Sequence, residues 1–83
     1  MQRVIMGIEL RDRCASAPAF QELLTGYGEV IGTRIGLHQC AGQKEGETGL
    51  ILLEFLCGAE QKAAAFEEEA ARLPGVKIQK MIF

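Results

Sequence analysis

The sequence is poor in the residue types that build disulfide frameworks and common catalytic sites. Its 83 residues include three cysteines, at positions 14, 40 and 57, which form no CxxC pair and are odd in number. This pattern argues against a disulfide scaffold and favours reduced thiols, with Cys57 expected in the core at the end of an apolar strand. The single histidine offers no Ser–His–Asp or Cys–His arrangement, and no glycine-rich phosphate loop precedes either predicted helix. We therefore expect no enzyme, no catalytic residues and no cofactor.

Long apolar runs and clusters of basic residues are also absent. No segment approaches the roughly 20 apolar residues that a membrane-spanning helix requires, and the apolar stretch near Met1 is too short for a signal peptide. The net charge is −2 and the basic residues are scattered, unlike the basic surface of a nucleic-acid-binding protein. These features predict a cytoplasmic protein that binds neither membrane nor nucleic acid directly.

The small size of the chain limits its core. A domain of this length buries about 60–65% of its unfolded surface, which usually requires a disulfide, a metal or self-association as further support. Because the cysteines do not predict disulfides, we expect a homo-oligomer, either a dimer or a tetramer.

Hydrophobic periodicity predicts four strands and two helices. Alternation marks strands over residues 4–10, 29–37 and 76–83, and a nearly continuous apolar run marks a buried strand over 49–56. Phe20, Leu23, Leu24 and Tyr27 form one helical stripe between a Ser16 cap and Gly26. A second helix is predicted over 59–73, where Glu68 and Arg72 have the spacing of an ion pair and Pro74-Gly75 end the helix.

This βαββαβ order predicts a fold of the α+β class. Two right-handed crossovers on an antiparallel sheet give the ferredoxin-like arrangement, with strand order 4-1-3-2 and both helices on one face. Residues 1–83 would then form a single domain, with the strand at 49–56 in the interior of the sheet. The segment 38–48 is polar and contains glycines, which predicts a hairpin loop.

Strict alternation divides the strand residues between two faces of the sheet. The side chains expected to face the helices are Val4, Met6, Ile8, Leu10, Ile31, Ile35, Ile51, Leu53, Phe55, Val76 and Ile78. The side chains expected on the opposite face are Ile5, Gly7, Glu9, Gly32, Arg34, Gly36, Leu50, Leu52, Glu54, Leu56, Gln79 and Met81. This second set combines large aliphatic residues, glycines and charges, and it has no helix to cover it.

The candidate site lies on this uncovered face and consists of Glu9, Gly32, Arg34, Gly36 and Glu54. Glycine inside a strand often marks the close approach of another backbone or a ligand, and Gly32 and Gly36 flank Arg34. One interpretation is an Arg–Glu cluster at a subunit interface or in the cleft of a small-molecule ligand. The alternative is an ordinary cross-strand ion pair, which contributes less than about 1 kcal/mol.

His38 and Cys40 invite a metal interpretation, because imidazole and thiolate are good ligands for zinc, nickel or copper. Two ligands in one loop make only half a site, which a second subunit would have to complete. We therefore predict no metal site within one chain and keep a metal sensor as an alternative.

Several segments together resemble the iron-only hydrogenase system regulators. They are Asp12-Arg13, Leu23-Leu24, the second-strand sequence Ile31-Gly32-Thr33-Arg34-Ile35-Gly36, Leu50-Ile51 and Leu73-Pro74-Gly75-Val76-Lys77. The resemblance covers nearly the whole chain. It implies an ACT-like domain, similar to the ligand-binding half of nickel-responsive regulators, that forms oligomers through its sheets. It also implies a regulatory role linked to iron-only hydrogenase or anaerobic metal metabolism.

Two classes of function therefore remain open from the sequence. The first is a non-enzymatic regulatory module that self-associates through its sheet and senses a small ligand or docks a partner. The second is a dimeric α+β-barrel enzyme of the small monooxygenase type, which shares the topology and would need a deep apolar pocket between helices and sheet.

Overall fold

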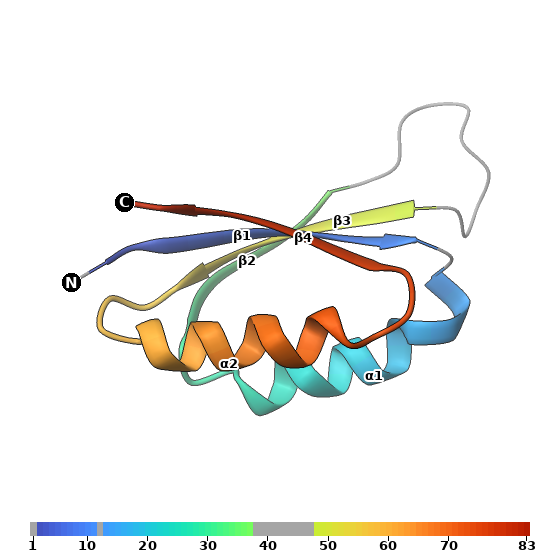
Figure 1. Cartoon of the computed structure of the whole chain (residues 1–83), viewed down its shortest axis with the longest axis horizontal. Helices are drawn as coiled ribbons and strands as arrows, with labels where there is room; N and C mark the ends of the chain where they lie inside the picture. The colour runs from blue at the N-terminus through green and yellow to red at the C-terminus, as the bar shows by residue number, and fades with distance from the viewer. Residues whose placement is uncertain (1, 12, 38–47) are drawn as a thin grey trace.

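The computed structural model describes residues 2–11, 13–37 and 48–83. Figure 1 shows one sheet with two helices packed against one of its faces. The elements in chain order are β1 (Val4–Arg11), α1 (Arg13–Gly26), β2 (Ile31–Leu37), β3 (Thr48–Phe55), α2 (Glu60–Ala71) and β4 (Val76–Ile82). The sheet is antiparallel with the order β2-β3-β1-β4, so the predicted βαββαβ topology is confirmed.

The predicted elements all form, with small shifts at their ends. The first helix begins at Arg13 rather than after a cap at Ser16, and it carries Pro18 in its interior. The second helix ends at Ala71, and the Arg72 guanidinium that follows it donates to Glu68 at 2.9 Å, as the spacing predicted. Among the described residues, no helix combines the length and apolar character needed to cross a membrane.

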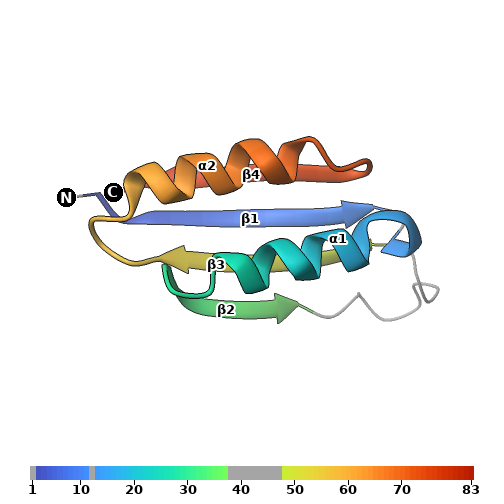
Figure 2. The same ribbon diagram turned by 90° about the horizontal axis from the view of Figure 1, so that it is seen from below.

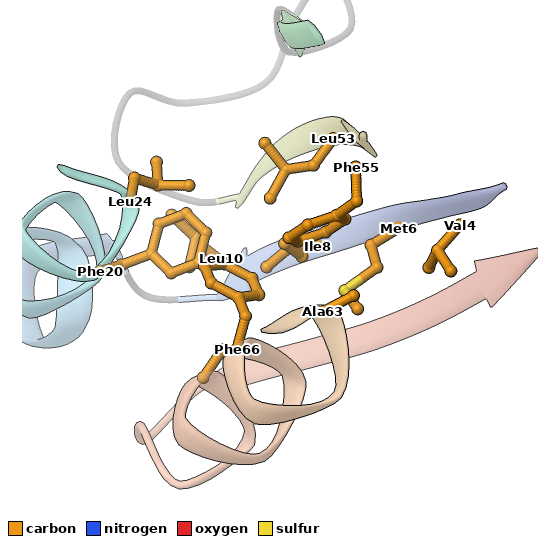
Figure 3. Packing of buried hydrophobic residues seen from close by; sticks show 11 residues of the cluster. Val4, Met6, Ile8, Leu10, Phe20, Leu24, Leu53, Phe55, Ala63 and Phe66 are labelled. Atoms are coloured by element: carbon orange, nitrogen blue, oxygen red, sulfur yellow. The ribbon is translucent and has the colours of Figure 1, made fainter. Parts of the chain in front are cut away.

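The core lies between the helices and the two central strands (Figure 3). Its centre is Phe66 of α2, which is fully buried and packs edge-on against three aromatic rings. The ring centroids of Phe20, Tyr27 and Phe55 lie 6.1, 5.3 and 5.5 Å from that of Phe66. Such edge-to-face pairs add about 0.5–1.5 kcal/mol each to the burial of their area, so Phe66 joins both helices to β3.

Glycine fixes the corner where β4 begins beside the end of β1. Gly75 has a positive φ of 76°, and its carbonyl oxygen accepts a 2.8 Å hydrogen bond from the Arg11 amide. A Cβ at Gly75 would lie 2.6 Å from the Arg11 carbonyl oxygen. Both the backbone conformation and the close approach therefore require glycine here.

A β-bulge interrupts the pairing of β2 with β3. Ile31 lies opposite Phe55, but the next residue of β3, Glu54, lies opposite Thr33 rather than Gly32. Two residues of β2 thus oppose one residue of β3, which is the defining property of a bulge. Because side chains alternate between the faces of a sheet, the extra residue reverses the facing of every later residue in β2.

This reversal corrects the predicted faces of β2. Ile35 was expected to face the helices, but it pairs with Leu52 on the opposite side of the sheet. Arg34 and Gly36 were expected on that opposite side, but they pair with Leu53 and Ile51 and face the helices. The prediction was wrong because it assumed uninterrupted alternation through Gly32.

The helices cover the sheet unevenly (Figure 2). They lie over β4, β1 and β3, whereas β2 forms an edge beyond α1. Six of the seven β2 residues are accordingly exposed, from Gly32 to Leu37. The face of the sheet turned away from the helices has no cover within the described part of the chain, and it forms the candidate functional surface.

Candidate functional site: the open face of the sheet

We define the open face as the side of the sheet turned away from α1 and α2. The strand pairings place the following residues on it: Ile5, Gly7 and Glu9 of β1; Thr33, Ile35 and Leu37 of β2; Leu50, Leu52 and Glu54 of β3; and Lys77, Gln79 and Met81 of β4. Leu56 continues this face beyond the end of β3, where it lies beside Gly32.

Large aliphatic side chains dominate the open face. The exposed fractions are 48% for Ile35, 43% for Leu37, 38% for Leu50, 50% for Leu56 and 55% for Met81. Single exposed apolar residues are normal on a protein surface, whereas several large ones on one sheet face are typical of interaction surfaces. This apolar character agrees with the expectation that Leu50, Leu52 and Leu56 need a second cover.

Arg34, the centre of the candidate site predicted from the sequence, does not lie on the open face. Its guanidinium points to the helix side, where Nη2 donates a 2.9 Å hydrogen bond to the Gln21 side chain of α1. The expected pairing of Arg34 with Glu54 is therefore wrong, because the two residues lie on opposite sides of the sheet.

The two glycines beside Arg34 have different surroundings. A Cβ on Gly32 would lie 2.9 Å from Cδ2 of Leu56, so this glycine makes room for a side chain of the open face. A Cβ on Gly36 would have no heavy atom within 4 Å. Gly32 thus lies in the bulge and leaves room for the side chain of Leu56. Gly36 instead faces open space on the helix side.

The two predicted carboxylates do lie on the open face, each with a partner other than Arg34. Glu54 accepts a 2.9 Å hydrogen bond from the Thr33 hydroxyl and lies 3.5 Å from the Arg3 guanidinium. Glu9 accepts a 3.0 Å hydrogen bond from Arg11. These pairs are solvent-exposed, so each contributes about 0–1 kcal/mol to stability.

A hollow of about 290 Å³ lies in the open face above Gly7. Its lining consists of Gly7, Glu9, Leu50, Leu52, Lys77 and Gln79. Gly7 stands between Leu52 on one neighbouring strand and Gln79 on the other. Because Gly7 has no side chain, the sheet surface is lower here than at the residues around it.

Lys77 is a residue of this face that the predicted site did not include. It lies directly across from Glu9 in the β1–β4 pairing, but Glu9 is engaged by Arg11. Within the described residues, the Lys77 ammonium makes no hydrogen bond or ion pair. The alternation of β4 placed Lys77 on the same side as Gln79 and Met81, so the sequence did carry the signal for its facing.

The cysteine and histidine residues proposed from the sequence as metal ligands or core residues form no site within the described part of the chain. The described part of the chain contains no cluster of three or more His, Cys, Asp or Glu residues suited to a metal ion. His38 and Cys40 lie outside the described residues. Cys57 is exposed in the turn after β3, so the prediction that it lies in the core is wrong.

One polar contact links the two helices. The hydroxyl of Tyr27, just after α1, donates a short hydrogen bond to Glu69 of α2. This hydrogen bond raises the pKa of Tyr27 above its usual value of 10.0, and desolvation and the negative charge of Glu69 act in the same direction.

Comparison with known proteins identifies the fold but not a family. No protein-family model matches the chain, and no curated relative does. The uncharacterized protein TM1266 from Thermotoga maritima superposes with a TM-score of 0.80 at 20% identity, over 100% of this chain and 99% of that one. A dimeric ferredoxin-like protein from an uncultured marine organism gives a TM-score of 0.54 at 9% identity, over 99% of this chain and 92% of that one.

A third likeness is to part of an enzyme. A formyltetrahydrofolate deformylase from Pseudomonas putida matches with a TM-score of 0.55 at 10% identity, over 95% of this chain but only 28% of the enzyme. At such identities the likeness concerns the backbone, so the resemblance to the iron-only hydrogenase system regulators stays a prediction. Together with the sheet order, these likenesses show that the chain has the ferredoxin-like βαββαβ fold.

Proposed function

We propose that this protein is a non-enzymatic regulatory module that self-associates through the open face of its sheet. The observation that carries the proposal is the set of exposed aliphatic side chains that share the open face, Ile35, Leu37, Leu50, Leu56 and Met81. The regulatory role, sensing a small ligand or docking a partner in iron-only hydrogenase or anaerobic metal metabolism, rests on the sequence resemblance.

The size of the open face suits pairing with a second copy. Eight-residue strands in β1 and β3, at about 3.3 Å per residue and about 4.8 Å between four strands, give a flat footprint of roughly 500 Å² per copy. Pairing of two copies then buries roughly 1,000 Å² in total, and the uneven surface of the side chains adds to this flat estimate. That area is near the lower bound for a stable interface. Two stacked sheets also form a common packing arrangement.

The helix layer is a poor partner for this face. The exposed residues of α2 include Gln61, Lys62 and Glu68, so this layer is highly polar. Most side chains of the open face are aliphatic, and its charged residues are Glu9, Glu54 and Lys77. It therefore complements another open face better than it complements a helix layer, which favours a twofold pair with the same surface on both sides.

Two single substitutions, Met81→Ser and Ile82→Ser, test whether the open face is the surface of self-association. The two residues are adjacent and similarly exposed, at 55% and 49%, but Met81 lies on the open face and Ile82 on the helix side. We expect sedimentation velocity to show an oligomer for the wild type, weaker association for Met81→Ser and unchanged association for Ile82→Ser. A wild-type protein that stays monomeric at micromolar concentration contradicts the proposal, as do equal effects of the two substitutions.

A further inference from the structure

We infer that the hollow above Gly7 is a binding site for a small aliphatic carboxylate, which becomes enclosed when two open faces pair. This inference rests on the proposed self-association, and it names the ligand class that such a pair would sense. Three properties of the hollow carry it: its shape, its uncompensated charge and the apolar side chains beside that charge.

The shape comes from one missing side chain in the middle of the sheet. A Cβ on Gly7 would lie 3.5 Å from Cδ2 of Leu52 and 3.9 Å from the Gln79 carbonyl oxygen, which are ordinary contact distances. An alanine would therefore fit without strain, so backbone geometry does not demand glycine here. The volume of about 290 Å³ is at the lower end of the range for small-molecule pockets.

The charge comes from Lys77. The described open face and its ends carry three cations, Arg3, Arg11 and Lys77, but only two carboxylates, Glu9 and Glu54. Arg3 is paired with Glu54, and Arg11 is paired with Glu9. Lys77 is the cation left over at the rim of the hollow, and covering the face would remove water from an unpaired ammonium, which is costly. A bound anion removes this penalty.

The groups around the hollow specify what kind of anion fits. The lining also includes the Glu9 carboxylate, whose charge is compensated by Arg11 at 3.0 Å. The Lys77 ammonium next to the amide of Gln79 therefore suits a singly charged carboxylate, which accepts hydrogen bonds from both. Leu50 and Leu52 supply the opposite wall, where an aliphatic chain would lie on apolar surface. A multiply charged anion such as phosphate would meet too few cations and would be placed against leucine side chains. The chemistry therefore favours an anionic head with a short hydrocarbon tail.

The test is a calorimetric titration of the full chain with butyrate, hexanoate, hexylammonium and inorganic phosphate. We expect binding of the carboxylates alone, with hexanoate about tenfold tighter than butyrate because it buries two more methylene groups. Lys77→Gln should weaken hexanoate binding by about tenfold or more, because a hydrogen bond to a charged group is lost, and Lys77→Arg should largely restore it. Gly7→Ala should also weaken binding, because its methyl group fills the floor of the hollow.

Lys62→Gln is the matched control, since it makes the same charge change on an exposed position of α2. Hexylammonium binding as strong as hexanoate binding, or equal effects of Lys62→Gln and Lys77→Gln, would overturn the inference. So would the absence of any hexanoate binding. Sedimentation of the same samples separates the two proposals. A dimer that binds no carboxylate refutes the site alone, whereas a monomer that binds hexanoate through Lys77 refutes self-association and the enclosure of the site but supports the ligand class.

Discussion

Introducing lysine at two adjacent positions of β2 tests the bulge and the open face together. Ile35 lies on the open face and is 48% exposed, whereas Gly36 faces the helix side, where an added Cβ would have no heavy atom within 4 Å. The substitutions Ile35→Lys and Gly36→Lys therefore add the same side chain to opposite sides of one strand. We expect Ile35→Lys to abolish self-association at micromolar concentration and Gly36→Lys to leave it intact.

The expected loss of association free energy follows from the exposure of Ile35. Burying an isoleucine completely contributes about 1.5–3 kcal/mol, so covering its exposed half contributes about 1 kcal/mol per copy. A twofold interface contains the residue twice, which gives about 2 kcal/mol. Desolvation of two lysine ammonium groups costs about as much again. The combined loss of about 4 kcal/mol weakens the dimer roughly 1,000-fold.

Sedimentation velocity over a concentration series measures this change, and circular dichroism melting checks that each variant is folded. The measurement separates the observed pairing from strict alternation, which would place Ile35 against the helices and Gly36 on the open face. Under strict alternation, Ile35→Lys would unfold the chain and Gly36→Lys would break the dimer. That outcome, or equal effects of the two variants on association, would refute the reasoning.

Two further predictions concern the helix layer and the corner at β4. Gly75→Ala should destabilise the fold by about 2–4 kcal/mol, because it combines a positive φ with a clash against the β1 backbone. Gly26→Ala, with no neighbour within 4 Å of its Cβ, should be neutral or stabilising in the same denaturant titration; equal losses would contradict the account. Spectrophotometric titration should place the Tyr27 pKa above 10.0, and Glu69→Ala should lower it. Because the folded-state pKa is raised, this contact stabilises the protein below pH 10 and is lost as the pH rises through the folded-state value; an unchanged midpoint in Glu69→Ala would argue against the contact.

Much of the fold was predictable because its signals are local or periodic. The alternation of Val4, Met6, Ile8 and Leu10 gave the buried side of β1, and all four are buried. The helical spacing of Phe20 and Leu24 gave the buried side of α1 in the same way. Pro74-Gly75 predicted that α2 ends before them, since proline cannot continue a helix and Gly75 adopts a positive φ.

The facing of β2 could not be predicted because a bulge has no periodic signature. Gly32 was interpreted as a point of close approach, which agrees with its position beside Leu56, but a glycine does not reveal that one residue of the ladder is skipped. The error then spread to Arg34, Ile35 and Gly36, since each residue inherits its facing from the one before it.

The partners of the charged residues were also beyond the sequence. Glu54 pairs with Arg3, which precedes β1 and lies outside the strand predicted over residues 4–10. Side-chain pairing on a surface depends on the lengths and rotamers of several competing partners, so strand register alone does not settle it.

The bulge at Gly32 and Thr33 has an evolutionary consequence. Deleting one residue there would restore plain alternation, and Ile35 would exchange sides with Arg34 and Gly36. A single-codon deletion would thus remove Ile35 and Leu37 from the open face and bring Arg34 and Gly36 onto it, without altering any residue of the buried core. One deleted residue would therefore change several side chains of the open face at once, whereas a substitution nearby changes only one.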